Sequence, residues 1–391
     1  MRRLTEFLFL EPELLRRRRT LHRHPETGFD LPATHDFVAA ELTALGIPFV
    51  PHVGKNSLLG ILKNGEGPVL GLRADMDALP VTELNPDLPW RSEVPGKMHA
   101  CGHDAHTAIL LTAAEFLNSH RESWKGTVKL IFQEAEEGPN PGGAYGLCRS
   151  GLLDDVEDFF ALHVSPSLPT GVLASKEGEM MASADTVKIR LLGKGCHAAY
   201  PHLGIDPILM QAEAILAFQT IVSRRLDPTE NAVLTIARVA AGTTHNVIPA
   251  FADLEGTVRT FNEATRDRME TEIENVLRAV TSRHGGSYEW KYIREYDPTV
   301  NTPETARFFR KTVEAALGKD AYVPLDKPTM GAEDFSRYAA LRKGCIAWLG
   351  TRKDEATSQS LHHPAFQLDE DALKTGVAVF VNLIETYGKD E

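Results

Sequence analysis

The chain has 391 residues, 42% of them hydrophobic, and its 42 Lys and Arg against 54 Asp and Glu give a net charge of −12. This length allows one to three domains, and the acidic balance argues against a surface that neutralises phosphates, so nucleic acid is not expected as a partner. The four cysteines form no CxxC pair, which is typical of a reducing compartment and predicts a cytoplasmic protein.

The first twenty residues have neither a secretory nor a membrane pattern. Glu6 and Glu11 interrupt the apolar stretch, and no small-residue cleavage site follows it. No apolar run in the chain approaches the ~20 residues that a membrane-spanning helix needs. The four arginines at 16–19 are expected on the solvated face of an opening helix.

Residues 57–164 alternate short β-rich runs with a helical pattern. This order predicts an α/β domain whose sheet is mostly parallel, with helices on both faces. The helix is expected at 106–119, with Asp104 as its N-cap. The expected strands cover residues 57–63, 68–75, 127–133 and 159–164.

A second pattern follows between residues 184 and 293. Its order is βαββαβ, which is the split unit of ferredoxin-like folds. The expected strands are 186–193, 232–239, 252–260 and 287–292, and the expected helices are 206–223 and 266–283. Because helices return afterwards and one ends the chain near 368–386, we expect a first domain of residues 1–180 and 295–391 interrupted by a domain of residues 181–294.

The segment MHACGHDAH contains a candidate metal site. In extended backbone Cys101 and His103 would point the same way, because residues two apart share a side. A thiolate and an imidazole suit borderline divalent ions such as Zn, Mn, Co or Ni. The alternative is a buried cysteine beside a hydrogen-bonded histidine.

An acidic run, Glu134 to Glu137, follows the strand at 127–133. Adjacent carboxylates are costly to bury without a cation. Since consecutive side chains diverge, Glu137 can ligate a metal while Glu136 faces the attacking water as a general base. The alternative is an acidic loop in solvent.

Further ligand types stand near the ends of other β-like runs. His163 belongs to the strand at 159–164, and the SLHHP segment supplies His362 and His363. Asp75 and Asp77 lie two positions apart at the end of the strand at 68–75. Open α/β domains bind ligands at such strand ends. The alternative for His163 is a hydrogen-bonded histidine of the core. The alternative for the two aspartates is a capped turn before Pro80.

Taken together, these segments resemble a known family over nearly the whole chain. The sequence is similar to the metal-dependent amidohydrolases of the peptidase M20 family, in the subgroup of N-acetyldiaminopimelate deacetylases and hippurate or other N-acyl-amino-acid hydrolases. The motifs that carry the resemblance are LHRHPETGF, LRADMDALP, MHACGHDAH, EAEEGPNPGG, ALHV, GKGCHAAYPHLGIDP, NVIP, EGTVRT, MGAEDF and SLHHP.

The resemblance implies two divalent metal ions per subunit, with Mn, Zn, Co or Ni as candidates. Glu136 is implied as the general base, and Asp75 or Asp77 as the carboxylate that orients a metal ligand. The family usually has a proline where this chain has Glu134, which we expect to point away. The implied ligands are Cys101, which bridges both ions, His103, Glu137, His163 and His362, with His363 as the alternative to His362.

The inserted domain is implied to serve as a lid and a dimerisation domain, in a homodimer or a homotetramer. Its Arg259 suits a substrate carboxylate because a guanidinium fork matches it in bidentate fashion. His197 with Asn246 would stabilise the developing oxyanion.

The expected reaction is removal of the acyl group from an N-acylated amino acid. The specific expectation is hydrolysis of N-acetyl-LL-2,6-diaminopimelate to acetate and LL-diaminopimelate, on the acetyl branch of lysine biosynthesis. A hippurate hydrolase, a general N-acyl-amino-acid hydrolase or an aminoacylase is the alternative, and an inactive metal-free binding scaffold is the alternative of another class. A distant charged end of the substrate would require polar pocket residues, whereas a benzoyl group would require apolar ones.

Overall fold

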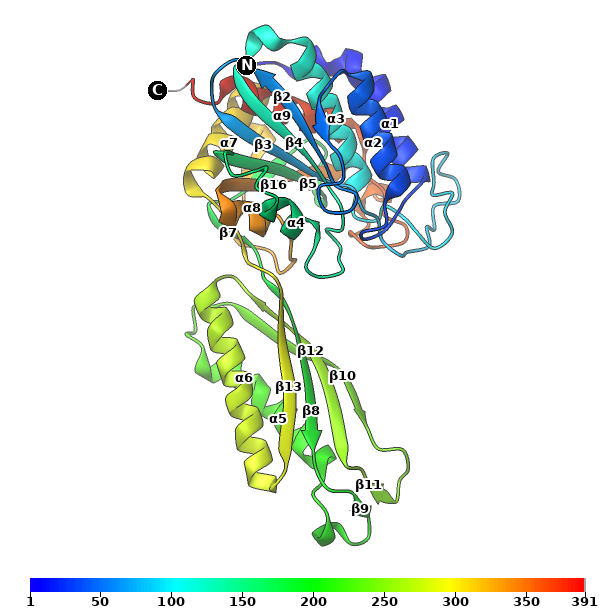
Figure 1. Ribbon diagram of the computed structural model, residues 1–391, viewed down its shortest axis with the longest axis vertical. Helices are drawn as coiled ribbons and strands as arrows, with labels where there is room; N and C mark the ends of the chain where they lie inside the picture. The colour runs from blue at the N-terminus through cyan, green and yellow to red at the C-terminus, as the bar shows by residue number, and fades with distance from the viewer. Residues whose placement is uncertain (390–391) are drawn as a thin grey trace. The chain divides into compact units, whose positions relative to one another are not determined.

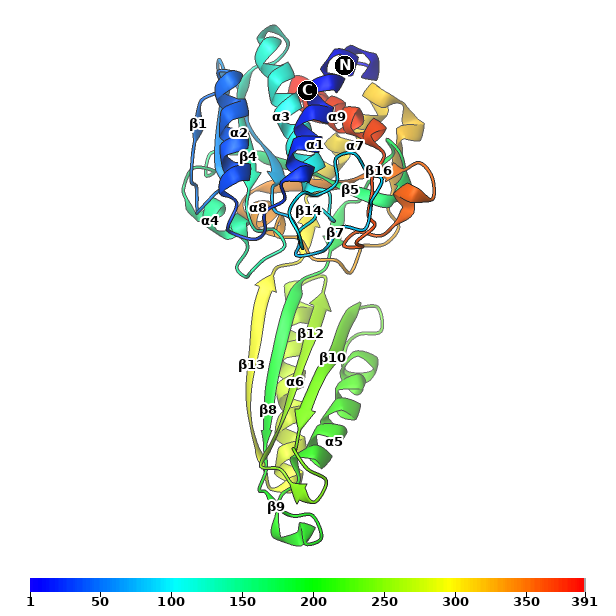
Figure 2. The same ribbon diagram turned by 90° about the vertical axis from the view of Figure 1, so that its right-hand side faces the viewer.

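The computed structural model describes residues 1–389, and it divides into two compact units (Figures 1 and 2). Unit 1 comprises residues 1–180, residues 300–328 and the chain from residue 334 onward. Unit 2 comprises residues 181–299 and 329–333.

The framework of unit 1 is an eight-stranded mixed sheet with a parallel centre. Strands β4, β3, β5 and β16 are neighbours and run parallel, whereas β1 and β2 join one side of this group in antiparallel fashion. Beyond β16, β6 pairs antiparallel to β16 and parallel to β15. In sheet order the strands are β1 (Phe49–Val50), β2 (Leu58–Asn64), β4 (Gly126–Gln133), β3 (Val69–Asp75), β5 (Asp158–Pro169), β16 (Lys343–Arg352), β6 (Leu173–Ser175) and β15 (Tyr322–Pro324).

Helices cover both faces of this sheet. Successive strand residues point to opposite faces, and Phe160 meets Phe308 on one face while Phe159 meets Tyr338 on the other. The first face carries α1 (Glu11–Arg23), α2 (Pro32–Ala44), α3 (His103–Ser119), α7 (Pro303–Leu317) and α9 (Leu373–Thr386), and the second carries α4 (Gly143–Arg149) and α8 (Ser336–Leu341). Short 3₁₀ segments lie at Leu4–Leu10, Arg121–Ser123, Lys319–Ala321, Ala356–Ser358 and Glu370–Ala372.

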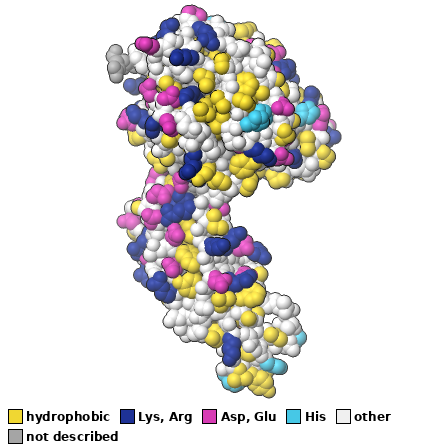
Figure 3. Space-filling view, viewed as in Figure 1, with side chains coloured by type: hydrophobic (Ala, Val, Ile, Leu, Met, Phe, Trp, Pro, Cys, Tyr) yellow, Lys and Arg dark blue, Asp and Glu magenta, His cyan; other side chains and the backbone are white. Residues whose placement is uncertain are grey.

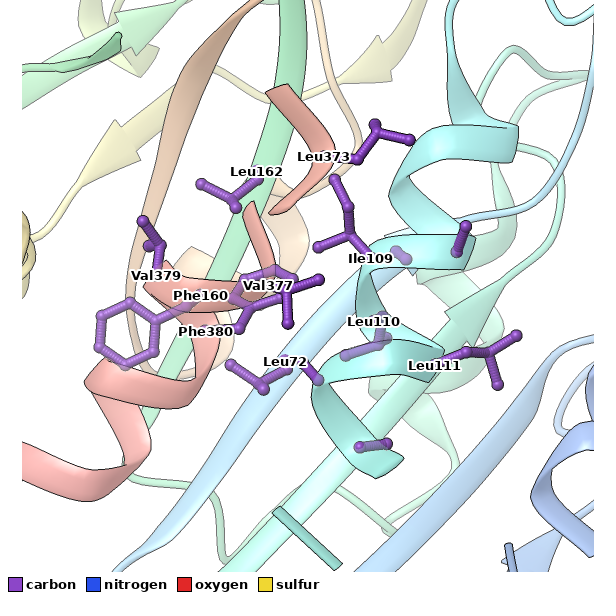
Figure 4. Close-up of a cluster of buried hydrophobic side chains, with 14 of the residues drawn as sticks. Leu72, Ile109, Leu110, Leu111, Phe160, Leu162, Leu373, Val377, Val379 and Phe380 are labelled. Atoms are coloured by element: carbon purple, nitrogen blue, oxygen red, sulfur yellow. The ribbon is translucent and has the colours of Figure 1, made fainter. Parts of the chain in front are cut away.

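Helix α3 lies in the middle of the unit 1 core. Its side chains are buried on nearly every side, as expected for a helix that packs against a sheet and further helices. Figure 4 shows Ile109 and Leu110 of α3 on the side of the helix that faces the strand residue Leu72 and the α9 residue Val377. A Cβ atom at Gly376 would lie 2.7 Å from Ile109, so this glycine lets α9 approach α3 closely.

The start of α3 differs from the prediction. We expected the helix at 106–119 with Asp104 as its N-cap, but the helix begins at His103 and Gly102 occupies the N-cap with φ +83°. A Cβ atom at Gly102 would also lie 2.4 Å from Val164. Asp104 is instead buried and accepts hydrogen bonds from Arg18 and the His22 ring, each at 2.8 Å. A polar contact with α1 therefore takes the place of the predicted cap.

The prediction of a solvated arginine face on α1 was wrong for two of its four residues. Arg17 and Arg18 are only 3% and 2% exposed. Buried guanidinium groups need anionic partners, and Arg17 donates to Glu41 of α2 and Glu115 of α3, both at 2.7 Å. The arginine run therefore ties α1 to its neighbouring helices.

Unit 2 has the predicted βαββαβ order. Its sheet order is β10-β12-β8-β13 with all pairs antiparallel. The side chains of Asp206 and Asn262 cap the two helices by accepting hydrogen bonds from backbone N–H groups. The elements are β8 (Ala184–Leu192), α5 (Pro207–Thr220), β10 (Ala232–Ala241), β12 (Phe251–Thr260), α6 (Glu263–His284) and β13 (Ser287–Tyr296), with a π-helical turn at Ile221–Arg225.

The remaining short elements complete the chain. Strands β9 (Cys196–His197) and β11 (Val247–Ile248) pair as a small ribbon in unit 2, and the chain between them forms a 3₁₀ turn at Pro201–Leu203, α5 and β10. Strands β7 (Gly178–Met181) and β14 (Thr299–Asn301) lie where the chain passes between the units. Over residues 1–389, no helix has the combined length and apolarity needed to cross a membrane. Acidic and basic side chains are interspersed over the face seen in Figure 3.

Candidate metal centre

The carboxyl ends of three neighbouring parallel strands bring ligand-type side chains to one edge of the unit 1 sheet. Asp75 ends β3 and is level with Gln133, the last residue of β4, which the acidic run follows. His163 lies on β5, the other neighbour of β3. Because parallel strands end at the same edge, these residues converge there.

Two sets of ligand atoms share the sulfur of Cys101. In the first set it lies with His103 and His163, and in the second with Glu137 and His362; within each set the atoms are at most 4.8 Å apart. The Cys101 Sγ and His163 Nε2 atoms are 3.5 Å apart, and the Glu137 Oε1 and His362 Nε2 atoms are 3.1 Å apart. One shared sulfur with two ligand pairs is an arrangement that could hold two neighbouring cations.

Cys101 and His103 do not meet in the way that the sequence reasoning assumed. That reasoning required an extended backbone, whereas Gly102 between them has left-handed backbone and His103 is already helical. A glycine adopts this conformation at no steric cost. The turn at Gly102, rather than a strand, brings the thiol and the imidazole to one site.

The charges around His103 suit a bound cation. Its two ring nitrogens are buried and have no hydrogen-bond partner among the described residues. Burial alone would lower the pKa of His103, but the carboxylates of Asp75 and Asp77 raise that pKa to about 10. Asp77, Asp75 and Glu136 come within 3.5, 3.8 and 3.9 Å of the ring. A bound divalent ion would supply the positive charge that these carboxylates otherwise draw from a proton.

His163 and Cys101 differ from His103, because their surroundings favour the uncharged form of each side chain. His163 Nδ1 lies 2.8 Å from the carbonyl oxygen of Val164, which can only accept, so the proton resides on Nδ1 and the Nε2 lone pair faces Cys101. Burial and the neighbouring His106 hold the pKa of His163 well below its usual range. Burial and the carboxylates of Glu137 and Glu136 raise the pKa of Cys101, and a divalent ion bound by the sulfur would favour the thiolate.

The two aspartates of the LRADMDALP segment have different partners. Asp77 accepts hydrogen bonds from the backbone N–H groups of Glu136 and Glu137 at 2.9 and 3.0 Å, and its Oδ1 atom lies 3.5 Å from His103 Nδ1. Asp75 is bonded to Arg73 at 2.7 Å and to His106 at 2.6 Å. Asp77 therefore touches both the acidic run and a candidate ligand directly.

Sequence reasoning missed a buried polar network beneath the site. Arg73 is 1% exposed, and it donates to Gln133 at 3.0 Å and to Asp334 of the MGAEDF segment at 2.9 Å. Asp334 also accepts from the backbone N–H of Ala144 at 3.0 Å. A charged residue inside the apolar strand VLGLRAD was the available signal, because a buried arginine requires partners.

The remaining predicted residues of unit 1 have clear positions. Glu134 points away from the cluster, as expected, because its carboxylate accepts hydrogen bonds from the backbone N–H groups of Lys55 and Asn56. His362 has φ +67° and donates its backbone N–H to Ala100 at 2.8 Å, which places its ring beside Glu137. His363 is exposed, and its Nδ1 atom accepts from Ala365 at 3.1 Å. The structure thus brings His362 to the cluster.

The predicted substrate-binding residues of unit 2 lie on two elements. His197 is on β9 opposite Val247 of β11, and the backbone N–H of Ala198 donates to the Asn246 carbonyl oxygen at 3.0 Å, so His197 and Asn246 are neighbours. Arg259 lies on β12, where its guanidinium donates to the carbonyl oxygen of Val258 at 3.0 Å.

Comparison with known proteins supports the resemblance. An N-acetylcysteine deacetylase of Bacillus subtilis is 39% identical over 95% of both chains, and the IAA-amino acid hydrolase ILR1-like 4 of Arabidopsis thaliana is 38% identical over 95% of this chain and 84% of that protein. A dinuclear metal-binding peptidase of the M20 family from Bacillus subtilis superposes with a TM-score of 0.84 at 34% identity, covering 98% of this chain and 99% of that one. The model of peptidase family M20/M25/M40 matches residues 71–386, and the chain therefore belongs to this family.

Proposed function

We propose that the protein hydrolyses the amide bond of N-acylated amino acids with two divalent metal ions. The observation that carries this proposal is the pair of ligand sets sharing Cys101, next to two adjacent carboxylates, Glu136 and Glu137. The N-acetylcysteine deacetylase and the IAA-amino acid hydrolase among its relatives support an N-acyl amino acid as the substrate class.

The proposed roles divide the two glutamates. Glu137 is a metal ligand together with Cys101, His103, His163 and His362. Bound there, two divalent ions would polarise the scissile carbonyl and lower the pKa of the attacking water. The carboxylate of Glu136 accepts the water proton and passes it to the leaving amine, while its backbone is held by Asp77.

Unit 2 supplies the proposed contacts to the rest of the substrate. We assign the substrate carboxylate to Arg259 and the developing oxyanion to His197 and Asn246. A homodimer or homotetramer through unit 2 is part of the proposal. It is supported by apolar side chains that α5 exposes, namely Ile208, Leu209 and Leu216 at 44%, 56% and 72% exposure.

The specific substrate proposed is N-acetyl-LL-2,6-diaminopimelate, in a cytoplasmic pathway of lysine biosynthesis. Its distant charged end requires polar groups in the pocket, whereas hippurate requires an apolar pocket for the benzoyl group. A general N-acyl-amino-acid hydrolase is the second candidate, which the variety among the relatives favours.

A panel of acetyl, succinyl and benzoyl amino acids, including N-acetyl-LL-diaminopimelate, tests the proposal. Each substrate is assayed with protein loaded separately with Mn, Co, Zn and Ni, and bound metal is counted. We expect two ions per chain and the highest kcat/KM for N-acetyl-LL-diaminopimelate. Preference for benzoyl-glycine would replace that substrate, and a protein that binds no stoichiometric metal would be a scaffold.

A further inference from the structure

A cavity of about 480 Å³ lies in unit 1 directly beside the candidate metal centre. Glu137, a proposed metal ligand, forms part of its wall together with Gly138 and Pro139. The rest of the wall comes from three other parts of the chain, which are residues 27–30, Lys55 and residues 78–80. A group bound in this cavity would be continuous with a group held at the metal centre.

The loops around this cavity are tied to one another. The Asn56 side chain donates to the Phe29 carbonyl oxygen at 2.7 Å, and Ala78 donates its backbone N–H to the Glu26 carbonyl oxygen at 2.7 Å. A Cβ atom at Gly28 would lie 3.1 Å from the Gly138 carbonyl oxygen, so these two loops are in close contact. A cavity held in this way is formed before any ligand arrives.

Glu134 fixes the segment that carries Lys55. Its carboxylate accepts the backbone N–H of Lys55 at 2.8 Å and that of Asn56. Gly54 has φ +93°, and a Cβ atom there would lie 2.6 Å from Glu134 Oε1. Glu134, which stands where the family usually has a proline, therefore places a buried acceptor under the loop that carries Lys55.

The chemistry of the cavity changes from its wall to its mouth. Phe29, Leu79 and Pro80 make the wall apolar, while Lys55 and Asp30 contribute one charge of each sign. The Lys55 Nζ and Asp30 Oδ1 atoms are 3.5 Å apart, and their side chains are 61% and 82% exposed. Such an exposed ion pair contributes little to stability. Breaking it so that Lys55 and Asp30 can each bind a ligand group therefore costs little free energy.

We propose that this cavity binds the remote end of the substrate, which is an aliphatic chain ending in a second amino-acid group. Lys55 binds the remote carboxylate, Asp30 binds the remote ammonium, and the apolar wall contacts the methylenes between. The assignment rests on the proposed function, because it places the scissile amide at the metal centre beside Glu137. A zwitterionic end satisfies both charges, whereas an aromatic or purely aliphatic group would satisfy neither.

The first test compares four N-acetyl amino acids that differ only at the remote end. N-acetyl-LL-diaminopimelate carries both charges, N-acetyl-2-aminopimelate the carboxylate alone, N-acetyl-lysine the ammonium alone and N-acetylnorleucine neither. With the Mn-loaded protein we expect kcat/KM to be highest for the first. In Lys55→Met the ratio of kcat/KM between diaminopimelate and lysine substrates should fall about tenfold, and in Asp30→Asn the ratio between diaminopimelate and aminopimelate substrates should fall similarly.

Lys63→Met is the matched control. Lys63 is also exposed, but it lies on β2 opposite Thr127, at the start of β4 and thus at the other edge of the sheet. This variant should keep all four kcat/KM values. Equal loss on all four substrates in Lys55→Met, or no preference among them in the unaltered protein, would overturn the assignment while leaving the amidohydrolase proposal intact.

A binding measurement separates the two proposals if no substrate is cleaved. Titration calorimetry with LL-diaminopimelate and norleucine, using Mn-loaded protein, should show tighter binding of diaminopimelate. In Lys55→Met the ratio of the norleucine Kd to the diaminopimelate Kd should fall about tenfold. Loss of turnover with this binding intact would contradict the proposed reaction alone. Equal affinity for both ligands would contradict the cavity assignment.

Discussion

The carboxylate of Asp77 accepts a hydrogen bond from the backbone N–H of Glu136 at 2.9 Å. The same carboxylate accepts the next N–H group along the chain, that of Glu137, at 3.0 Å. One buried side chain thus fixes the backbone of both the proposed base and a proposed ligand, and it also lies 3.5 Å from the ring of His103. The positions of these three residues are therefore coupled.

Replacing Asp77 should weaken metal binding without removing a ligand. Asp77→Ala leaves two backbone donors unpaired and removes the carboxylate that lies 3.5 Å from the His103 ring, so we expect Mn affinity to fall about 10- to 100-fold. Asp77→Asn keeps an acceptor oxygen and should lose less. Metal titration measures both, with the exposed Asp87→Ala as the control. Unchanged affinity in Asp77→Ala would contradict the positioning role.

Glu136→Gln should separate catalysis from metal binding. The amide has nearly the size of the carboxylate but cannot accept the water proton, so we expect kcat to fall about 10²- to 10⁴-fold. The metal content should stay at that of the unaltered protein because the proposed ligands are intact. Metal analysis and steady-state kinetics on the same sample measure the metal content and kcat of the variant. Full turnover would rule out Glu136 as the base.

Replacing Cys101 should release more metal ions per chain than replacing His163 or His362. Because its sulfur belongs to both ligand sets, Cys101→Ala should lower occupancy at both sites, whereas His163→Ala and His362→Ala should each lower it at one. Metal counts after dialysis against trace Mn measure this, and Cys196→Ser in unit 2 is the control. The two-site arrangement would be wrong if Cys101→Ala lost a single ion.

The elements that the sequence predicted best are those with a local signal. The βαββαβ order of unit 2 follows from its alternating strand and helix patterns, and the helix expected at 266–283 is observed as α6, Glu263–His284. The parallel centre of the unit 1 sheet follows from the same rhythm, and the strand ends then indicate where His163 and Asp75 meet. Periodicity is sufficient for these features because each is specified within about twenty residues.

The features that the sequence did not predict depend on contacts between distant residues. Aspartate is a common N-cap residue, and Asp104 was therefore predicted to cap the helix. Its carboxylate instead binds Arg18, which is 86 positions away, and the helix begins at His103. Arg73 and Asp334 are 261 positions apart and pair beneath the site. No local pattern encodes such a pair, because tertiary burial decides which polar groups must satisfy one another.

The contact between Arg17 and Glu41 leads to a prediction about stability and pH. Burial would raise the pKa of Glu41, but hydrogen bonds from Arg16 and Arg17 outweigh it and lower that pKa. A carboxyl group with a lowered folded-state pKa stabilises the fold above its unfolded pKa, about 4.3, and loses that contribution as the pH falls through the folded value. The Glu41 contribution should therefore be complete at pH 7 and decline progressively below about pH 5.

Glu41→Gln tests this dependence against a matched variant on the same arginine run. At pH 7 we expect the free energy of unfolding to fall by about 1–2 kcal/mol, because Arg17 is buried and keeps only Glu115 as an anionic partner. Glu13→Gln breaks a pair with Arg16 whose side chains are 49% and 44% exposed, and it should cost less than about 0.5 kcal/mol. Urea unfolding followed by tryptophan fluorescence measures both variants. The gap between Glu41→Gln and the unaltered protein should narrow from pH 5 to pH 3, and a gap that stayed constant would show that the ion pair is not its source.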